Sequence, residues 1–313
     1  MLMHYKLIFL IISSDNEPVY TQMKHLSPKY YNLYSDKIKY FFIENRQMID
    51  NQVIEDNNFL YINGTESFIP GIYHKSIKAL EYINNKYSYD YVIRTNLSTF
   101  WHMENLFKLL DIKPKERFAG GYAFQGFISG TGIIMSRDVG NIVASNLNSA
   151  YIGDDLAISQ IIESRGIRIY DIIEYKWGFL IPQIDNLPSN CKYLNINDNN
   201  FSDILNFRIK NGGDRSTDIH YFNVLLEKLY NIGNEYDENV FVYNNPMTNN
   251  IVESVTNNII KPITNNIVEP INKLINEPLT NVIEPINELI NKSVTNAILK
   301  YNKILLLKRK IRR

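Results

Sequence analysis

Three groups of polar residues have side-chain types that acid–base and anion-binding chemistry can use. Two adjacent carboxylates, Asp154 and Asp155, open a segment with helical spacing. The polar cluster "RTNLS", residues 94–98, ends a β-branched apolar run, and basic residues gather in "NFRIKNGGDRSTDIH", residues 206–220. α/β proteins place ligand sites at the carboxyl ends of buried strands, and Arg and Lys are the usual partners of phosphate. These residue types favour a polar site for an anionic ligand, provided that the fold brings them together.

The same residues also have purely structural interpretations. Asp154 and Asp155 can act as an N-cap and as partners of a helix dipole. Residues 206–220 can form a solvated surface loop, and His220 falls on an amphipathic helix, where a single histidine is more often structural. Residues 129–136, "SGTGIIMS", can be an ordinary turn into a strand. Both interpretations stay open at the level of the sequence.

The order of apolar patterns predicts an α/β fold with a mostly parallel sheet up to about residue 245. Short apolar runs alternate with segments of helical periodicity, which is the pattern of βα units. Strands are expected over residues 6–14, 37–44, 58–64, 89–94, 117–123, 131–136 and 167–172. Helices are expected over residues 18–26, 69–86, 103–110, 137–147, 154–166 and 216–230. Asp154 is expected to cap the helix that Gly166 ends, and residues 178–200, rich in Pro and Asn, are expected to be a loop.

Residues 246–313 are expected to form a repetitive tail, which leaves residues 1–245 as one folded domain. Asn- and Ile-rich units such as "TNNIVEPI" recur with a period of eight, and a proline marks most of them. Because an interior proline costs a helix about 3 kcal/mol, one straight helix is not expected before about residue 286. The tail carries ten Lys or Arg residues against five Glu. Docking on an anionic membrane surface is one interpretation, and self-association or low-complexity disorder are the others.

The composition limits the remaining classes of protein. The chain has 313 residues, 45% hydrophobic, with a formal net charge of zero, so it can bury a core but has no overall attraction to nucleic acid. Its one cysteine, Cys191, excludes an intramolecular disulfide framework. The apolar run of residues 7–12 is far shorter than the roughly 20 residues that cross a bilayer and lacks a small-residue cleavage site. We therefore expect a cytoplasmic or other reducing compartment and no secretion, with membrane association through the tail left open.

Four motifs, in order, resemble those of GT-A-fold glycosyltransferases, most closely the fringe and β-1,3-galactosyltransferase group. They are "HKSIKAL" with Lys75, "RTNLS" at 94–98, "SGTGIIMS" at 129–136 and "GDDLAIS" at 153–159. The match covers roughly residues 5–230. The resemblance implies a GT-A-like sheet, a nucleotide-sugar donor, most simply UDP-linked, and a glycan or glycoconjugate acceptor, with no nucleic-acid partner.

The resemblance also implies roles for individual residues. Asp155 would be the general base that takes a proton from the acceptor hydroxyl, with Asp154 as its catalytic neighbour. Trp101 and Trp177 would form an apolar platform for the acceptor sugar, with core packing as the alternative. The nucleotide sugar would contact Ser13, Ser14, Lys75, Arg94, Asn96, Ser98, Gly130, Gly132, Arg208, Lys210, Arg215 and His220.

The metal-binding acids of the family fall on Asn96, Leu97 and Ser98, and none of these is a carboxylate. Mn²⁺ and Mg²⁺ prefer carboxylate oxygens, so either ion is expected to be held weakly at best, and no metal ligand is assigned. Arg and Lys residues would then meet the charge of the departing nucleoside diphosphate. The expected function is an inverting, metal-independent glycosyltransferase. The alternative is a catalytically inactive GT-A-like glycan-binding or scaffold protein, which the lost carboxylates favour.

Overall fold

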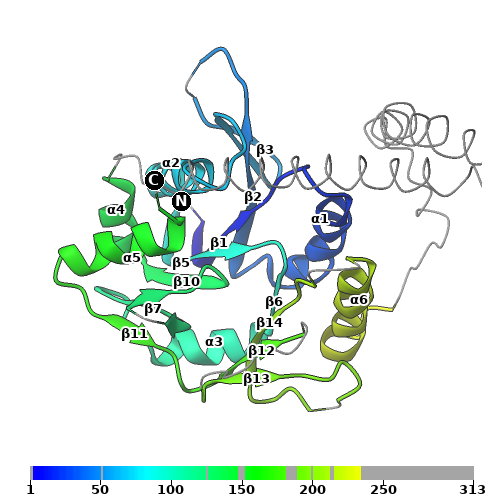
Figure 1. The fold of residues 1–313 in the computed structure, drawn as a ribbon. Coiled ribbons are helices and arrows are strands. Elements are labelled where there is room, and N and C mark those ends of the chain that lie inside the picture. The colour runs from blue at the N-terminus through cyan, green and yellow to red at the C-terminus, as the bar shows by residue number, and fades with distance from the viewer. Residues whose placement is uncertain are drawn as a thin grey trace, which may run out of the picture. The chain divides into compact units, whose positions relative to one another are not determined.

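The computed structural model describes most of the chain up to residue 233, within a compact unit that spans Met1–Glu235 (Figure 1). The described residues are 3–50, 52–124, 126–146, 152–180, 189–198, 200–211 and 215–233. The predicted repeat tail, residues 246–313, lies outside them.

The centre of the unit is an eight-stranded, mostly parallel sheet (Figure 1). β10 and β3 run antiparallel to their neighbours, and the other six strands share one direction. In spatial order the strands are β11 (Ile169–Asp171), β7 (Ala119–Gly121), β10 (Gly132–Ser136), β5 (Ser88–Asn96), β1 (His4–Ile12), β2 (Ile38–Arg46), β4 (Phe59–Asn63) and β3 (Ile54–Asp56). The predicted α/β fold with a mostly parallel sheet is confirmed.

Side chains of the central strands alternate between two apolar cores, one on each face of the sheet. In β1, Leu7 and Phe9 belong to one core, and Ile8 and Leu10 to the other. Strands that are apolar on both faces are typical of parallel sheets covered by helices on both sides. The core of Leu7 is completed by α1 (Pro18–Tyr31), α3 (Met103–Ile112) and α6 (Ser216–Tyr230), and that of Ile8 by α2 (Gly71–Lys86), α4 (Arg137–Ala144) and α5 (Asp154–Ser164).

A second, smaller sheet lies at the end of β5. Its strands in spatial order are β13 (Cys191–Tyr193), β12 (Lys176–Phe179), β14 (Ile204–Arg208) and β6 (Thr99–Trp101). β6 follows β5 almost directly in the chain, and it pairs with β14 so that Thr99 faces Arg208. A short hairpin, β8 (Ala123–Phe124) with β9 (Phe127–Ile128), leads toward β10. β14 therefore brings a late part of the chain to the carboxyl end of β5.

Three local expectations are wrong. Residues 178–200 contain the end of β12 and all of β13, so this segment is more than a loop. The segment 206–220 does not begin as a loop, because Arg208 is the last residue of strand β14. The apolar residues of β14 are few and have polar residues on both sides, so the sequence does not mark this strand clearly. The N-cap of α5 is Gly153, and Asp154 is already its first helical residue. No helix within the described ranges is both long enough and apolar enough to cross a membrane.

Candidate functional site

The carboxyl ends of β1 and β5 meet the amino end of β10 at one edge of the main sheet. The register pairs Ile12 of β1 with Asn96 of β5, and Thr95 of β5 with Gly132 of β10. Residues that follow β1 and β5 therefore gather beside residues that precede the antiparallel β10. Ligands of open α/β sheets bind at this edge.

A cavity of about 560 Å³ opens at this edge. Its walls combine loops after β1 and β5, the turn before β10, the start of α5 and the end of β14. The predicted site residues that line it are Ser13, Ser14, Lys75, Arg94, Asn96, Ser98, Gly130, Asp154, Asp155, Arg208 and Lys210. The fold thus brings the three polar groups of the sequence into one site.

Arg94 and Asp154 form a buried ion pair in the cavity wall. Arg94 is 2% exposed, and its Nη2 lies 2.6 Å from a carboxylate oxygen of Asp154. Its Nη1 donates hydrogen bonds to the carbonyl of Gly130 at 2.5 Å and to Oδ1 of Asn96 at 3.1 Å. Burial raises the pKa of the Asp154 carboxyl, and Arg94 opposes that rise. A Cβ at position 130 would lie 2.8 Å from Nη1, so glycine leaves the room that the guanidinium needs.

Asp155 is the more accessible of the two acids. It is half-buried in the first turn of α5, where the positive end of the helix dipole stabilises an anionic side chain. Two backbone N–H groups donate to its carboxylate, from Gly130 at 3.2 Å and from Leu156 at 2.9 Å. Since Arg94 pairs with Asp154, Asp155 is held in the cavity wall by backbone and keeps an accessible carboxylate.

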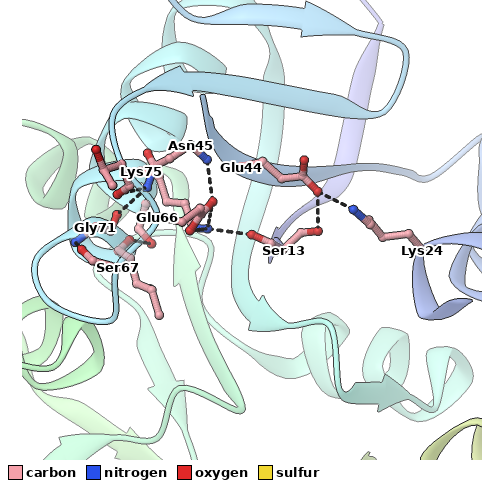
Figure 2. Close-up of polar contacts among 11 residues, drawn as sticks. Ser13, Lys24, Glu44, Asn45, Glu66, Ser67, Gly71 and Lys75 are labelled. Atoms are coloured by element: carbon pink, nitrogen blue, oxygen red, sulfur yellow. Dashed lines mark hydrogen bonds and ion pairs between the residues drawn. The ribbon is translucent and has the colours of Figure 1, made fainter. Parts of the chain in front are cut away.

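Two ion pairs, Lys75 with Glu66 and Lys24 with Glu44, hold the loop that follows β1 through hydrogen bonds to Ser13 (Figure 2). Lys75 is 1% exposed, and its Nζ donates to the carbonyl of Ser13 at 2.7 Å and to both carboxylate oxygens of Glu66 at 2.8 Å. Ser13 Oγ donates in turn to Oε1 of Glu44 at 2.8 Å, and Lys24 Nζ donates to the same oxygen at 2.7 Å. Burial lowers the pKa of Lys75, and Glu66 opposes this shift. These contacts indicate that Lys75 stabilises the cavity wall.

Replacing Lys75 with Met is expected to lower the free energy of unfolding by about 3 kcal/mol, because Glu66 and the Ser13 carbonyl would lose a buried partner. Urea denaturation measures the loss. The matched control is Lys78→Met on the same helix, since Lys78 pairs with Glu81 at 2.9 Å near the surface and should cost less than about 1 kcal/mol. Equal losses in the two variants would contradict a supporting role for Lys75.

Arg208 and Lys210 bring two positive charges to the cavity, and Asp218 offsets them only from beyond salt-bridge distance. Arg208 is half-buried, and its Nη1 donates to Ser98 Oγ at 2.6 Å. Burial lowers the pKa of Arg208 to about 10, with a further contribution from Arg94, so the guanidinium stays protonated at neutral pH. Lys210 is exposed at the cavity, and partial burial followed by the charge of Arg208 lowers its pKa. Among the described residues, neither forms an ion pair with a carboxylate. Two positive charges in one cavity wall are the arrangement that suits an anionic ligand.

The residues at the predicted metal position do not fit a divalent cation. Oδ1 of Asn96 accepts a hydrogen bond from Arg94, and Oγ of Ser98 accepts one from Arg208. Leu97 between them is buried and has no ligand atom in its side chain. A guanidinium directed at each oxygen would repel a metal ion. Within the described ranges, no three His, Cys, Asp or Glu side chains are grouped so that they could hold one.

Trp101 and Trp177 are core residues, so the expected acceptor platform of two indoles is wrong. They are 0% and 1% exposed, and the indole N–H groups donate to Thr95 Oγ1 and to the carbonyl of Ile172. Gly132 does not line the cavity either. A Cβ there would lie 2.5 Å from Cζ2 of Trp101, so this glycine makes room for the buried indole.

Replacing Gly132 with Ala is expected to destabilise the fold by about 1–3 kcal/mol, because the new methyl group would overpack the core against Trp101. Thermal unfolding followed by circular dichroism measures the change. Gly233→Ala is the control, since a Cβ at position 233 meets no atom within 4 Å. An unchanged midpoint for Gly132→Ala would contradict the packing role.

Arg215 and His220 lie outside the lining of the cavity. Arg215 precedes α6 and pairs with Glu17 at 2.5 Å and with Asp218. His220 is exposed on α6. The expectation that both contact the nucleotide sugar is therefore not met by the geometry.

The cavity also has lining residues that the sequence analysis missed. Glu17 and Tyr20 follow β1, Glu66 follows β4, and Phe179 ends β12. The first three obey the same rule as Ser13, because they come shortly after the carboxyl end of a parallel strand. No local pattern marks Phe179, which reaches the cavity through long-range pairing of its strand.

Comparisons with known proteins give matches among solved structures but none by sequence. No family model matches the sequence, and no curated protein matches it. A solved structure with a similar arrangement is that of a glycosyltransferase involved in the glycosylation of the major capsid of PBCV-1. It is 11% identical, the match covers 69% of this chain and 98% of that chain, and the TM-score is 0.40. At this level the likeness carries no conclusion about the reaction of this chain.

Proposed function

We propose that this protein is an inverting glycosyltransferase that moves a sugar from a nucleotide-sugar donor, most simply UDP-linked, to a hydroxyl of a glycan or glycoconjugate. The observation that carries the proposal is one cavity that holds the accessible carboxylate of Asp155 together with the cations Arg208 and Lys210. The order of the four motifs along the chain supports it.

The proposed reaction assigns one task to each group. The acceptor oxygen attacks the anomeric carbon as its proton passes to the carboxylate of Asp155. The bond between that carbon and the diphosphate oxygen breaks, and the electron pair leaves with the nucleoside diphosphate. Arg208 and Lys210 bind the negative charge that develops on the leaving group. Attack from the face opposite the diphosphate inverts the anomeric configuration.

Arg94 and Asp154 are proposed as positioning residues rather than as reactants. Their ion pair is buried, and Arg94 also binds the carbonyl of Gly130, whose N–H donates to Asp155. The pair therefore holds the backbone that orients the base. Because Arg94 and Arg208 occupy the oxygens of Asn96 and Ser98, we propose that turnover needs no divalent metal.

The test is a panel of UDP-sugars and other nucleotide sugars with the full-length protein in EDTA. Nucleotide binding by calorimetry and release of nucleoside diphosphate are measured separately. Binding together with release supports the proposal. Nucleotide binding without turnover, with every acceptor and with added Mn²⁺, would favour the inactive scaffold, and no nucleotide binding at all would refute a nucleotide-sugar site.

A further inference from the structure

The cavity wall continues into a series of aromatic rings. Phe179 lines the cavity, and the centroid of its ring lies 6.4 Å from that of Tyr122. Tyr122 lies 6.3 Å from Phe124, and Phe124 lies 6.3 Å from Phe127 across the β8–β9 hairpin. We call these four residues, Tyr122, Phe124, Phe127 and Phe179, the aromatic strip.

The aromatic strip is partly accessible, and two of its rings, Tyr122 and Phe179, pack against the core. Phe124 is 41% exposed, and the other three rings are half-buried. Trp177 lies against the strip from the core, with its ring centroid 6.2 Å from that of Tyr122. The strip therefore presents apolar ring surface that is anchored to the core through Tyr122 and Phe179.

The same stretch of backbone positions the strip and the proposed base. Ser129 follows the hairpin, and its N–H donates to the carbonyl of Tyr122 at 2.8 Å. The next residue, Gly130, donates its N–H to Asp155. Ile128 of the hairpin donates its N–H to Ser159 of α5 at 2.9 Å, so the hairpin is bound to the helix that carries Asp155. A ligand on the strip would thus lie on a surface continuous with the cavity.

The chemistry of the strip selects a neutral ligand with an apolar face. None of its four side chains is charged, and the aromatic faces bury apolar C–H surface well. Polar groups lie at the edge of the strip. The exposed carboxylate of Asp171 accepts two hydrogen bonds through Oδ1, from the N–H of Ala123 at 3.0 Å and from Nδ2 of Asn190 at 2.9 Å. A pyranose ring combines an apolar C–H face with hydroxyl groups around its rim, which matches both features.

We propose that the aromatic strip binds a neutral pyranose ring of the acceptor glycan, with that ring stacked on Phe124 and Tyr122 and its reacting hydroxyl directed into the cavity toward Asp155. This assignment rests on the proposed function for its catalytic meaning. It replaces the two buried indoles as the acceptor surface.

Glycan binding tests the assignment independently of turnover. Saturation-transfer NMR is recorded on the full-length protein with a panel of neutral methyl hexosides and disaccharides. We expect saturation of ring protons for at least one of them, a loss of at least fivefold in Phe124→Ala and retention in Phe124→Tyr. The matched control is Ile112→Ala, which removes an apolar side chain, 67% exposed, from α3. No saturation with any saccharide, or the same saturation in Phe124→Ala, would overturn the assignment.

Two further measurements separate this assignment from the proposed function. If the protein turns over a nucleotide sugar, Phe124→Ala should raise KM for the acceptor at least fivefold, whereas Ile112→Ala should leave that KM unchanged. An unchanged acceptor KM would refute the strip alone. Saccharide binding without any turnover would refute the transferase and retain the strip as a glycan-binding surface. If Phe124→Ala instead converts a dimer to a monomer in sedimentation, the strip is an interface between copies, and the assignment is wrong.

Discussion

Asp155→Asn is expected to lower kcat for sugar transfer by about 10²–10⁴-fold, the range that a positioned general base contributes. The amide keeps the size of the side chain and one of the two oxygens that accept from the N–H groups of Gly130 and Leu156, but it cannot take the proton of the acceptor hydroxyl. Binding of the nucleotide should change little, because Asp155 is assigned to the acceptor side of the reaction. The measurements are initial rates at saturating substrates and calorimetric titration with the nucleoside diphosphate.

The control for this variant lies on the same helix. Glu163 is exposed near the end of α5 and does not line the cavity. Glu163→Gln removes one carboxylate from the helix without touching the site, so its kcat should equal that of the wild type. If Asp155→Asn retains full kcat, the base has been assigned to the wrong residue.

Arg208→Gln is expected to lower kcat by about 10²–10³-fold, comparable to the loss of one preorganised group that stabilises developing charge. The guanidinium is held by Ser98, is protonated at neutral pH and has no carboxylate partner among the described residues. Its charge is therefore available to the leaving diphosphate. The affinity for the nucleoside diphosphate should fall together with kcat, which separates this variant from Asp155→Asn.

Two comparisons sharpen the result for Arg208. Arg165→Gln removes an exposed arginine from the end of α5, outside the cavity, and should leave both constants unchanged. Assays of the wild type in EDTA and in Mn²⁺ should give equal rates. Activity that disappears in EDTA and returns with Mn²⁺ would show that a metal, and not Arg208, meets the charge of the leaving group.

The sheet and most helices were predictable because their signals are local. Short apolar runs and the helical spacing of apolar residues are visible in any short window, and the predicted helix over residues 216–230 has the same bounds as α6. The strand-end rule also located Ser13, Arg94 and Asn96. Each of these residues follows or ends a buried run, so its place at the edge of a parallel sheet requires only that the strands align.

The features that the sequence did not reveal depend on contacts between distant segments. Nothing in the sequence near Trp101 indicates that Gly132 lies against the ring of Trp101. The sequence alone therefore could not distinguish a buried indole from one that is exposed at a binding site. Arg208 belongs to a strand because β14 pairs with β12 on one side and, on the other, with β6, which lies about a hundred residues earlier. The aromatic strip likewise forms from two segments, around Tyr122 and around Phe179, that the sequence leaves far apart.

The hydrogen bond from Arg208 to Ser98 has a consequence for how the site comes into existence. It joins residues 110 positions apart, so the cavity is complete only after β14 has docked beside β6. A nascent chain that ends before Arg208 contains the residues of every strand of the main sheet but lacks both α6 and one wall of the cavity. Because a ligand that needs both walls binds only the finished fold, it stabilises that fold by about 2.7 kcal/mol at a hundred times its Kd. A rise in the melting temperature on addition of nucleotide is therefore expected only for chains in which β14 has docked beside β6.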